Sequence, residues 1–532
     1  MLRSPPMAGI PREGIPPYPP TVWALVEQAA EQWSDHVLLA DDHGRSLTGR
    51  QLRDTAASTA AALAERGIGP GTIVSWQLPT TLETMVVMVA LARLGATQNP
   101  LIPILREREV RFITNQVGTE VFITTERWRG FDHGDLARTL AAEQGFTVVL
   151  TDLDTDPATI GNTLRLAQGD PATLGPPPPL DELPVRWIYT SSGTTADPKG
   201  VRHTDRSVMH GAGGPIGTGA APDDVNAVAV PVSHIGGMLM LAAGLMTGMR
   251  LALFESFDPA TSPERFAAHG ATVLGSAVPF FLAYFDAQQR HGDEPLFPRL
   301  RMLTGGGAPT PPEISRRARE VLGVRGIANS WGLTEFPVAT YGQLDAPLDV
   351  LDTTTGPAVA GVEVRVVTDA GRVGAPGEEG ELRLRGPQCF LGYVDASLDA
   401  DAFDDEGWFR TGDLGIIDAD GNVTVTGRIK DIIIRNAENI SALEIEDALY
   451  QHPAIADVAV VAAPDPRTGE RVCAFVVVAP DVDAPTVQSL GIHCRALGLA
   501  VQKCPEQLEL VDTLPRNSYG KVLKQELKAR IT

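Results

Sequence analysis

The chain has 532 residues, of which 43% are hydrophobic and 21% are charged; this composition is globular, and the length predicts several domains. Its 44 basic and 66 acidic side chains give a formal charge of −22. An acidic surface repels nucleic acid and anionic lipid, so we expect neither as a main partner. No uncharged apolar run approaches ~18 residues, and the first residues lack the apolar core of a signal peptide, so we expect no integral membrane association.

The cysteine and histidine patterns bear on compartment and metal chemistry. The four cysteines form no CxxC pair, and the ten histidines form no HxH or HExxH pattern. We therefore expect a reducing, cytoplasmic environment and no zinc site.

The N-terminal half predicts helices alternating with strands. Thr21 is a candidate helix cap, and residues 52–66 predict a helix that ends at a Gly- and Pro-rich stretch. Residues 73–78 then read as a buried strand. The alternation recurs over residues 227–322 and implies parallel sheet covered on both faces.

A loop dense in small and hydroxyl side chains follows a predicted strand at residues 184–189. Residues 189–200 read Tyr-Thr-Ser-Ser-Gly-Thr-Thr-Ala-Asp-Pro-Lys-Gly. Backbone N–H groups and one lysine can wrap an anion there. The loop is not a Walker A motif, and a mobile surface linker has the same composition. Taken alone, the loop leaves both interpretations open.

The period of the hydrophobic pattern changes after residue 342. Residues 363–367 and 381–385 alternate residue by residue, which predicts half-buried antiparallel strands. From residue 441 onward, a helix (443–451), two strands (458–461 and 473–478) and a second helix (487–497) predict a compact unit. The hinge before it is expected near residues 427–431.

Five further segments occur in a recognisable order. They are Gly305-Gly306-Gly307-Ala308-Pro309, Asn329-Ser330-Trp331-Gly332-Leu333-Thr334-Glu335, Trp408-Phe409-Arg410-Thr411-Gly412-Asp413-Leu414, Gly427-Arg428-Ile429-Lys430-Asp431 and Leu514-Pro515-Arg516-Asn517-Ser518-Tyr519-Gly520-Lys521. With the loop at 189–200, this set resembles the adenylate-forming superfamily of acyl-CoA synthetases, luciferases and peptide-synthetase adenylation domains. The resemblance runs from about residue 20 to the end and is closest to ligases of fatty, alicyclic or steroid-derived acids.

The resemblance implies an α/β fold in two domains. Residues 1–428 would form a large N-terminal domain of two stacked α/β subdomains plus a small antiparallel β subdomain. Residues 429–532 would form a small, mobile C-terminal α+β domain.

The resemblance also assigns the ATP site. Thr194, Thr195 and Lys199 would hold the β- and γ-phosphates, while Glu335 would bind Mg²⁺, which prefers oxygen ligands. Thr334 would donate to the α-phosphate. The full set of predicted cofactor-binding residues is Ser191, Ser192, Gly193, Thr194, Thr195, Lys199, Gly306, Gly307, Ala308, Pro309, Asn329, Ser330, Trp331, Gly332, Thr334, Asp413, Arg428 and Lys521.

Four of these residues have individual roles in the family. Trp331 would offer an aromatic face to adenine, where relatives commonly have tyrosine. Asp413 would accept hydrogen bonds from both ribose hydroxyls, and Arg428 would reach the ribose or the phosphates. Lys521 would bridge the substrate carboxylate and the α-phosphate. A lone Asp after Thr-Gly is usually a turn residue, and a lone C-terminal Lys is usually solvated. The order and spacing of the motifs favour site roles for Asp413 and Lys521 over these alternatives.

His234 resembles a residue that gates the acyl pocket in the family. The alternative is a core histidine beside a Gly-Gly bend. The candidate pocket residues are apolar or aromatic, which argues against an amino-acid substrate: His234, Met238, Phe280, Phe281, Trp331 and Pro337.

The family carries out a second half-reaction after rotation of the small domain. Lys430 matches the hinge position, where few dihedral changes are needed. Rotation would remove Lys521 and present residues 434–441 as the lining of a pantetheine tunnel for coenzyme A. Many relatives have Gly-Gly where this chain has Asn436-Ala437, so the added methyl group would narrow that tunnel.

We therefore predict an ATP- and Mg²⁺-dependent acid–CoA ligase acting on a hydrophobic carboxylic acid, with catalytic residues Lys521, Thr334, Glu335, His234 and Lys430. Two alternatives stay open: transfer of the acyl group to a carrier-protein thiol, and a nucleotide- or acyl-binding module without turnover. The sequence also leaves the oligomeric state open, a homodimer included.

Overall fold

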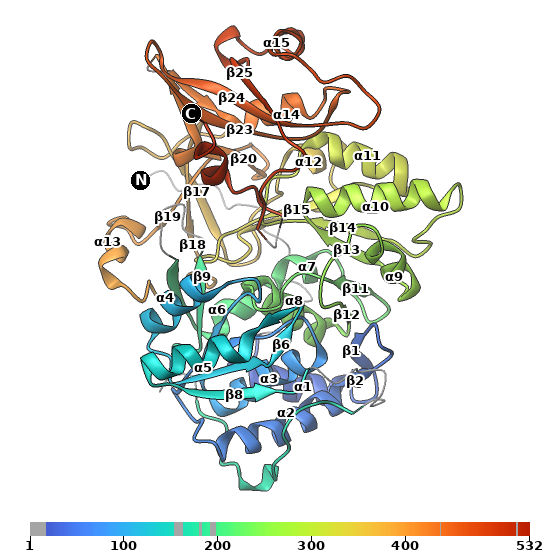
Figure 1. Cartoon of the computed structure of the whole chain (residues 1–532), viewed down its shortest axis with the longest axis vertical. Coiled ribbons are helices and arrows are strands. Elements are labelled where there is room, and N and C mark those ends of the chain that lie inside the picture. Colours follow the sequence, from blue (N-terminus) through green and yellow to red (C-terminus); the bar gives the residue numbers. More distant parts are fainter. Residues whose placement is uncertain are drawn as a thin grey trace.

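The computed structural model describes residues 18–153, 163–179, 184–191, 198–436, 438–517 and 520–531. Two largely parallel sheets form the large part of the molecule (Figure 1). The first, called the β3 sheet, has the order β10-β9-β4-β3-β5-β8 and is parallel except for the β9–β10 pair. Its strands are β3 (Ile73–Gln77), β4 (Thr97–Pro100), β5 (Val121–Thr125), β8 (Thr147–Thr151), β9 (Trp187–Ser191) and β10 (Lys199–His203).

The second sheet, called the β14 sheet, has the order β16-β15-β14-β13-β11-β12-β1-β2. It is parallel except for the β1–β2 and β15–β16 pairs at its two edges. Its strands are β1 (Val37–Asp41), β2 (Ser46–Thr48), β11 (Val225–Val228), β12 (Arg250–Leu253), β13 (Val273–Ser276), β14 (Met302–Gly305), β15 (Ile327–Trp331) and β16 (Thr340–Tyr341). A separate hairpin, β6 (Arg127–Trp128) and β7 (Phe131–Asp132), lies outside both sheets.

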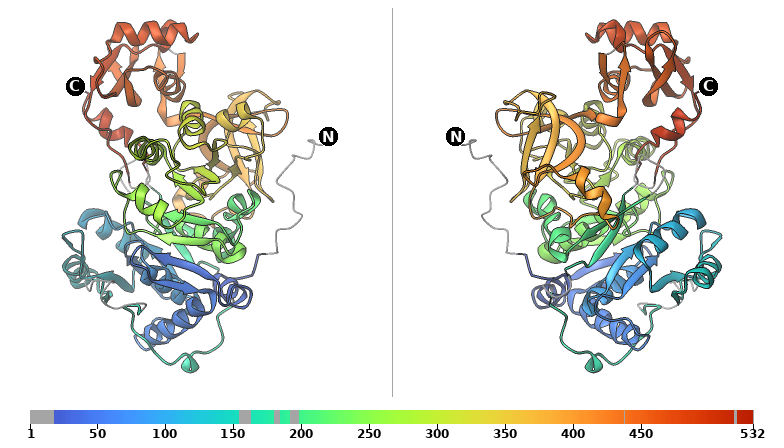
Figure 2. Two further views of the ribbon diagram at one scale, coloured as in Figure 1. Left: turned by 90° about the vertical axis from the view of Figure 1, so that its right-hand side faces the viewer. Right: turned by 90° about the vertical axis from the view of Figure 1, so that its left-hand side faces the viewer.

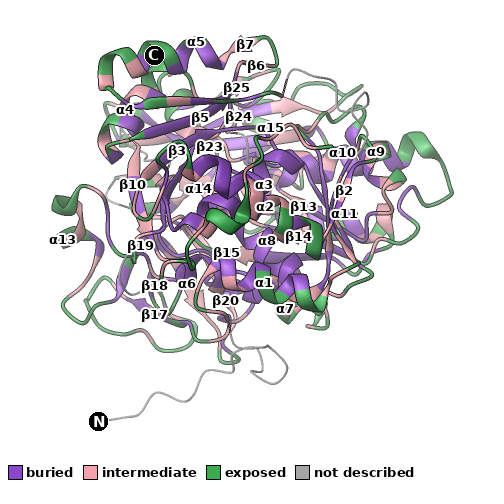
Figure 3. Cartoon of the chain, turned by 90° about the horizontal axis from the view of Figure 1, so that it is seen from below, coloured by how far each residue is buried: buried purple, intermediate pink, exposed green. Residues whose placement is uncertain are grey.

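Helix α3 (Leu82–Leu94) lies between the two sheets, because it contacts β4 of one and β1 of the other. Eleven of its 13 residues are buried, as expected of a helix that is apolar on all sides. One hydrophobic cluster accordingly runs through both sheets, and buried residues dominate the α3 and α8 region in Figure 3. The other helices here are α1 (Val22–Gln32), α2 (Gly49–Ala64), α4 (Glu107–Val117), α5 (His133–Gln144), α6 (Asp205–His210), α7 (Gly213–Gly217), α8 (Ile235–Thr247), α9 (Ser262–Ala268), α10 (Val278–His291), α11 (Pro312–Leu322) and α12 (Leu348–Thr353), with the 3-10 turn η2 (Pro171–Thr173).

An antiparallel sheet and a C-terminal unit complete the molecule (Figure 2). The antiparallel sheet has the order β17-β18-β19-β20, and its hydrophobic cluster also includes residues of β10, β15 and β16. Its elements are β17 (Glu363–Val367), β18 (Glu379–Arg385), β19 (Phe409–Ile417), β20 (Val423–Arg428), η3 (Ala396–Leu398) and α13 (Asp399–Ala402). The C-terminal unit packs two further hydrophobic clusters around a sheet of order β22-β21-β24-β23, with β25 beside β24. It comprises η4 (Ile429–Asp431), β21 (Ile432–Arg435), β22 (Glu438–Ser441), α14 (Ala442–Leu449), β23 (Ile455–Asp465), β24 (Gly469–Val478), α15 (Val487–Ala496), η5 (Val501–Lys503), β25 (Gln507–Leu510) and α16 (Lys524–Lys528).

This architecture confirms the predicted fold class: mixed α/β with a large N-terminal and a small C-terminal domain. Differences at element ends have local causes. Helix α2 begins three residues before the predicted position because Thr48 and Gln51 form a capping box. Strand β23 extends beyond the predicted residues 458–461 at both ends, where Asp and Pro residues with low strand propensity weaken the sequence pattern. No helix in the described residues could cross a bilayer.

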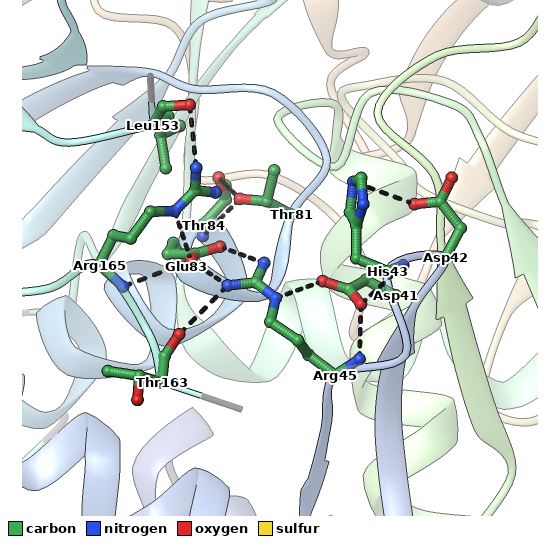
Figure 4. Close-up of polar contacts among 10 residues, drawn as sticks. All are labelled: Asp41, Asp42, His43, Arg45, Thr81, Glu83, Thr84, Leu153, Thr163 and Arg165. Atoms are coloured by element: carbon green, nitrogen blue, oxygen red, sulfur yellow. Dashed lines mark hydrogen bonds and ion pairs between the residues drawn. The ribbon is translucent and has the colours of Figure 1, made fainter. Parts of the chain in front are cut away.

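Buried charges connect the edge of the β14 sheet to α3 (Figure 4). Arg45, in the β1–β2 turn, donates bidentately to Glu83 at 2.6 and 3.1 Å and to Asp41 at 2.8 Å. Arg165 donates a further hydrogen bond to Glu83 at 3.1 Å and one to the carbonyl of Leu153 at 2.9 Å. Burial alone would raise the pKa of Glu83, but hydrogen bonds from the two arginines outweigh it and lower the pKa from 4.5 to about 2.

We predict that Glu83→Gln destabilises the large domain by about 3–5 kcal/mol, because it leaves Arg45 and Arg165 buried with less compensating charge. Urea denaturation at neutral pH measures the effect. Since the folded-state pKa is depressed, the advantage of the wild type should be fully present above pH 4.5 and disappear as the pH falls towards about 2. Glu264→Gln, in the exposed pair with Arg290, is the control and should leave the midpoint nearly unchanged.

Candidate active site

One cavity of about 1300 Å³ lies where the carboxyl ends of β13, β14 and β15 meet the antiparallel sheet and the C-terminal unit. Ligands of open α/β sheets bind at such carboxyl ends. Every described residue of the predicted site lines this cavity: Ser191, Lys199, His234, Gly306, Gly307, Ala308, Pro309, Asn329, Ser330, Trp331, Gly332, Thr334, Glu335, Asp413, Arg428, Lys430 and Lys521. Ser192, Gly193, Thr194 and Thr195 lie outside the described residues.

Glycines after β14 allow its backbone to lie close to β15. A Cβ atom on Gly306 would come within 2.5 Å of the Ser330 hydroxyl oxygen, and Gly307 has a φ of +77°. Both conditions favour glycine. The Ser330 hydroxyl also donates to the carbonyl of Gly305 at 2.9 Å. The segment after β14 thus presents backbone rather than side chains to the cavity beside Trp331.

Asp413 holds two side chains from different sheets together. It is the cross-strand partner of Arg428 in the β19–β20 pair, and the Arg428 Nε donates to its Oδ1 at 2.5 Å. The indole Nε1 of Trp331, at the end of β15, donates to the other carboxylate oxygen at 2.8 Å. Asp413 is 4% exposed, so this carboxylate needs such donors.

Lys521 reaches the cavity on a loop that rests against the N-terminus of α10. Gly520 has a φ of +80°, which favours glycine, and a Cβ there would make a tight contact of 3.1 Å with that of Ala277. Burial first, and repulsion from Arg428 second, lower the pKa of Lys521 to about 8, against the attraction of Asp413. The loop therefore brings the ammonium group into the charged end of the cavity.

The base of this loop is braced within the C-terminal unit. The Nη2 of Arg516 donates to both carboxylate oxygens of Asp457, at 2.8 and 2.7 Å, and its Nη1 donates to the carbonyl of Gly520. The hydroxyl of Tyr450 donates to the same Asp457 carboxylate at 2.5 Å. Tyr450 also packs against the core cluster of the large domain, so the brace lies at the interface between the two parts.

Sequence reasoning missed Tyr393, which supports two predicted site residues. Its hydroxyl donates to Glu335 Oε1 at 2.9 Å, and the Lys199 ammonium lies 4.9 Å from its ring centroid, within cation–π range. Tyr393 and Glu335 are 58 positions apart, and no spacing pattern in a single sequence joins residues so distant.

His203 is a second residue without a sequence signal. Burial lowers its pKa to about 4, so the ring is neutral near pH 7. Its Nε2 donates to the carbonyl of Thr334 at 2.8 Å, and its Nδ1 lies 2.9 Å from the Ser207 hydroxyl. The ring thereby fixes the backbone immediately before Glu335.

His234 lies beside the Gly-Gly bend and also lines the cavity, and its role as a gate of the acyl pocket stays a prediction. Its Nδ1 accepts a hydrogen bond from the Gly236 N–H at 3.1 Å and so caps α8, and the ring also lines the cavity. Burial lowers its pKa to about 4, which keeps it neutral. Two other pocket candidates, Met238 and Phe281, are fully buried and are absent from the cavity lining, because they face the core.

The segment expected to line a pantetheine tunnel forms an exposed hairpin, β21–β22. Of the described residues of this hairpin, Ile432 and Ser441 alone line the cavity, and Ile434 is 55% exposed. Asn436 has a φ of +50°, a left-handed conformation that asparagine tolerates better than most residues. Ala437 lies outside the described residues. Lys521 rather than the hairpin thus occupies the cavity.

Comparison with known proteins identifies the family. The AMP-binding enzyme model matches residues 26–394, and the AMP-binding enzyme C-terminal domain model matches residues 444–521. The chain therefore belongs to the AMP-binding enzymes and is an adenylate-forming ligase.

Its relatives differ in the acceptor that their names give. A medium-chain fatty-acid–CoA ligase of Escherichia coli is 32% identical over 518 residues, with 95% of this chain and 90% of that protein covered. A salicyl-AMP ligase / salicyl-S-ArCP synthetase of Mycobacterium tuberculosis is 34% identical over 521 residues, with the same coverage. Among solved structures, ATP-bound MatB from Rhodopseudomonas palustris superposes with a TM-score of 0.81 at 25% identity, covering 95% of this chain and 98% of that one.

We predict that Tyr393→Phe lowers kcat/KM for pyrophosphate release by about tenfold, because a hydrogen bond to a charged partner contributes about 1.5–3 kcal/mol and water replaces part of it. Tyr393→Leu also removes the ring beneath Lys199 and should lose more. Initial rates at varied ATP concentration provide the measurement. Wild-type kinetics in the phenylalanine variant would show that the hydroxyl does not support Glu335.

Proposed function

We propose that this adenylate-forming ligase is an ATP- and Mg²⁺-dependent acid–CoA ligase. It activates a hydrophobic carboxylic acid as acyl-AMP with release of pyrophosphate and then transfers the acyl group to coenzyme A. The observation that carries the proposal is one cavity with two unlike ends. Its charged end holds Lys521, Arg428 and Asp413, and its other end is uncharged.

The charged end suits attack on a phosphate. A carboxylate is a poor acyl donor until its oxygen becomes part of a good leaving group, AMP. Attack of that oxygen on the α-phosphate forms the new P–O bond and breaks the bond to pyrophosphate. Two anions must approach each other, so cations and oriented donors have to offset their charge. Lys521 would bridge the two reactants and Lys199 the departing phosphates.

The described residues fit a magnesium ion held mainly by nucleotide. Magnesium in such sites takes one or two protein carboxylates, with phosphate oxygens and waters as the other ligands. Glu335 supplies one carboxylate at the cavity wall, and no cluster of three or more His, Cys, Asp or Glu side chains in the described chain offers an all-protein site. When bound, the ion would neutralise charge on the phosphates.

The uncharged end favours an apolar acid. Between residues 211 and 312 the described lining includes no Asp, Glu, Lys or Arg, and the one histidine there, His234, is neutral. An amino-acid or dicarboxylate substrate would leave its second charge unpaired on this surface, which is costly. The lining is instead built from residues such as Leu239, Met240 and Phe280.

Coenzyme A is the acceptor that we propose, and a carrier-protein thiol is the alternative. One support is the resemblance of residues 432–441 to acid–CoA ligases. A second is the left-handed backbone of Asn436, a conformation that asparagine can adopt where many relatives have glycine. Rotation of residues 429–532 about Lys430, which removes Lys521 and brings in the hairpin, belongs to the same proposal.

A panel of saturated, alicyclic, aromatic and amino acids, assayed for pyrophosphate release with and without coenzyme A, tests this function. Acyl-CoA should form from an apolar member of the panel. Pyrophosphate release without acyl-CoA would redirect the second step to a carrier protein. No release with any acid would favour a binding module.

We predict that Lys521→Ala lowers adenylation by several orders of magnitude but leaves thioester formation from supplied acyl-AMP largely intact, because the lysine acts only in the first step. Pyrophosphate exchange measures the first step, and acyl-CoA formed from synthetic acyl-AMP measures the second. Loss of both steps would contradict the two-conformation scheme.

The pH dependence gives a further prediction. Lys521 loses its positive charge as the pH rises through about 8, so kcat/KM for pyrophosphate exchange should fall across that pH. Lys521→Arg should be slower but should lack this descending limb, because guanidinium stays charged. The same limb in the arginine variant would assign the titration to another group.

A further inference from the structure

Trp331 carries a hydrogen-bond donor that phenylalanine lacks and that tyrosine places elsewhere. Its indole N–H donates to Asp413 Oδ2 at 2.8 Å in a fully buried contact. The phenolic hydroxyl of tyrosine, the common residue at this position in the family, lies at the far tip of the ring. Trp331 thus lines the cavity and also donates a hydrogen bond to the Asp413 carboxylate.

The Asp413 carboxylate can accept more hydrogen bonds than the two that the described residues supply. An ionised carboxylate offers about four lone-pair positions, two on each oxygen. The Trp331 donor uses one on Oδ2 and the Arg428 Nε uses one on Oδ1. Each oxygen therefore keeps one lone-pair position for a further donor. The two remaining positions match in number the two vicinal hydroxyls of a ribose.

Both donors are carried by paired strands. Arg428 is the register partner of Asp413 across β19 and β20, and Trp331 ends β15 of the β14 sheet, paired with Thr340 of β16. The two donors approach the carboxylate from different sheets and so restrict its rotation. A carboxylate oriented before the ligand arrives loses less entropy on binding.

We propose that Trp331 is a positioning residue for ribose recognition: its indole N–H orients Asp413 so that both carboxylate oxygens receive the ribose hydroxyls of the nucleotide. The proposal rests on the proposed function, because it takes the nucleotide to bind at Asp413. It assigns to the Trp331 N–H a contribution separate from the aromatic face.

Binding of ATP and of 2′,3′-dideoxy-ATP, measured by calorimetry without any carboxylic acid, separates the two contributions. The wild type should bind ATP at least about tenfold more tightly than the dideoxy compound, since a site built to hydrogen-bond hydroxyls rejects an analogue without them. Trp331→Phe keeps an aromatic face and loses the donor. It should reduce this preference by about three- to tenfold, mainly by weakening ATP, while dideoxy-ATP binding changes little.

The preference is a ratio of two dissociation constants on one protein sample, so a partly unfolded preparation does not change it. Trp331→Tyr is the second variant, because it restores the common residue of the family and should show the same reduced preference. Asp413→Ala is the reference in which the preference should disappear. A preference unchanged from the wild type in both tryptophan variants overturns the proposal, and so does an equal loss of affinity for both nucleotides.

The outcomes also separate this inference from the proposed function. No ATP binding by the wild type would overturn both. Ribose-dependent binding by the wild type that persists in the Trp331 variants would overturn the inference alone and leave the ligase function standing.

Discussion

A carboxylate with 4% exposure, that of Asp413, joins the parts of the molecule around the cavity. A buried charge is stable only with donors around it, and here the donors come from β15 and from the end of β20. These hydrogen bonds therefore link the β14 sheet to the antiparallel sheet, next to a hydrophobic cluster that both sheets share. Arg428 is also the last residue before η4 and the C-terminal unit, so the same contact lies at the junction with that unit.

Lys521 lies close to Asp413 and Arg428, in surroundings that disfavour its positive charge. Burial and the nearby Arg428 disfavour its charge, which the lowered pKa of about 8 records. The packing of Gly520 against the start of α10 and the brace of Arg516, Asp457 and Tyr450 help to hold the loop in place. The ammonium group of Lys521 is therefore held at a place where its own charge is disfavoured.

The two ends of the cavity differ in character: one is lined by charged side chains and the other by uncharged ones. Neutral histidines contribute at both ends without adding charge: His203 fixes the backbone of Thr334, and His234 caps α8 beside the uncharged wall. Their low pKa values have one cause, burial, which makes the ring nitrogens fixed donors or acceptors near neutral pH. The relatives share the ligase scaffold and differ in the acids and acceptors of their names, as expected where function depends on such walls.

The sequence by itself predicted the main elements and a candidate set of site residues. Strand β3 and the segment after β14 follow local periodicity and glycine placement, and ordered motifs identified residues such as Asp413 and Lys521 that line one cavity. Only the tertiary structure decided that β1 pairs with β12 as well as with β2, that Met238 faces the core, and that Tyr393 holds Glu335. The physical reason is range. Propensity and capping act within a few residues, whereas a buried polar atom takes whichever partner the completed fold brings to it.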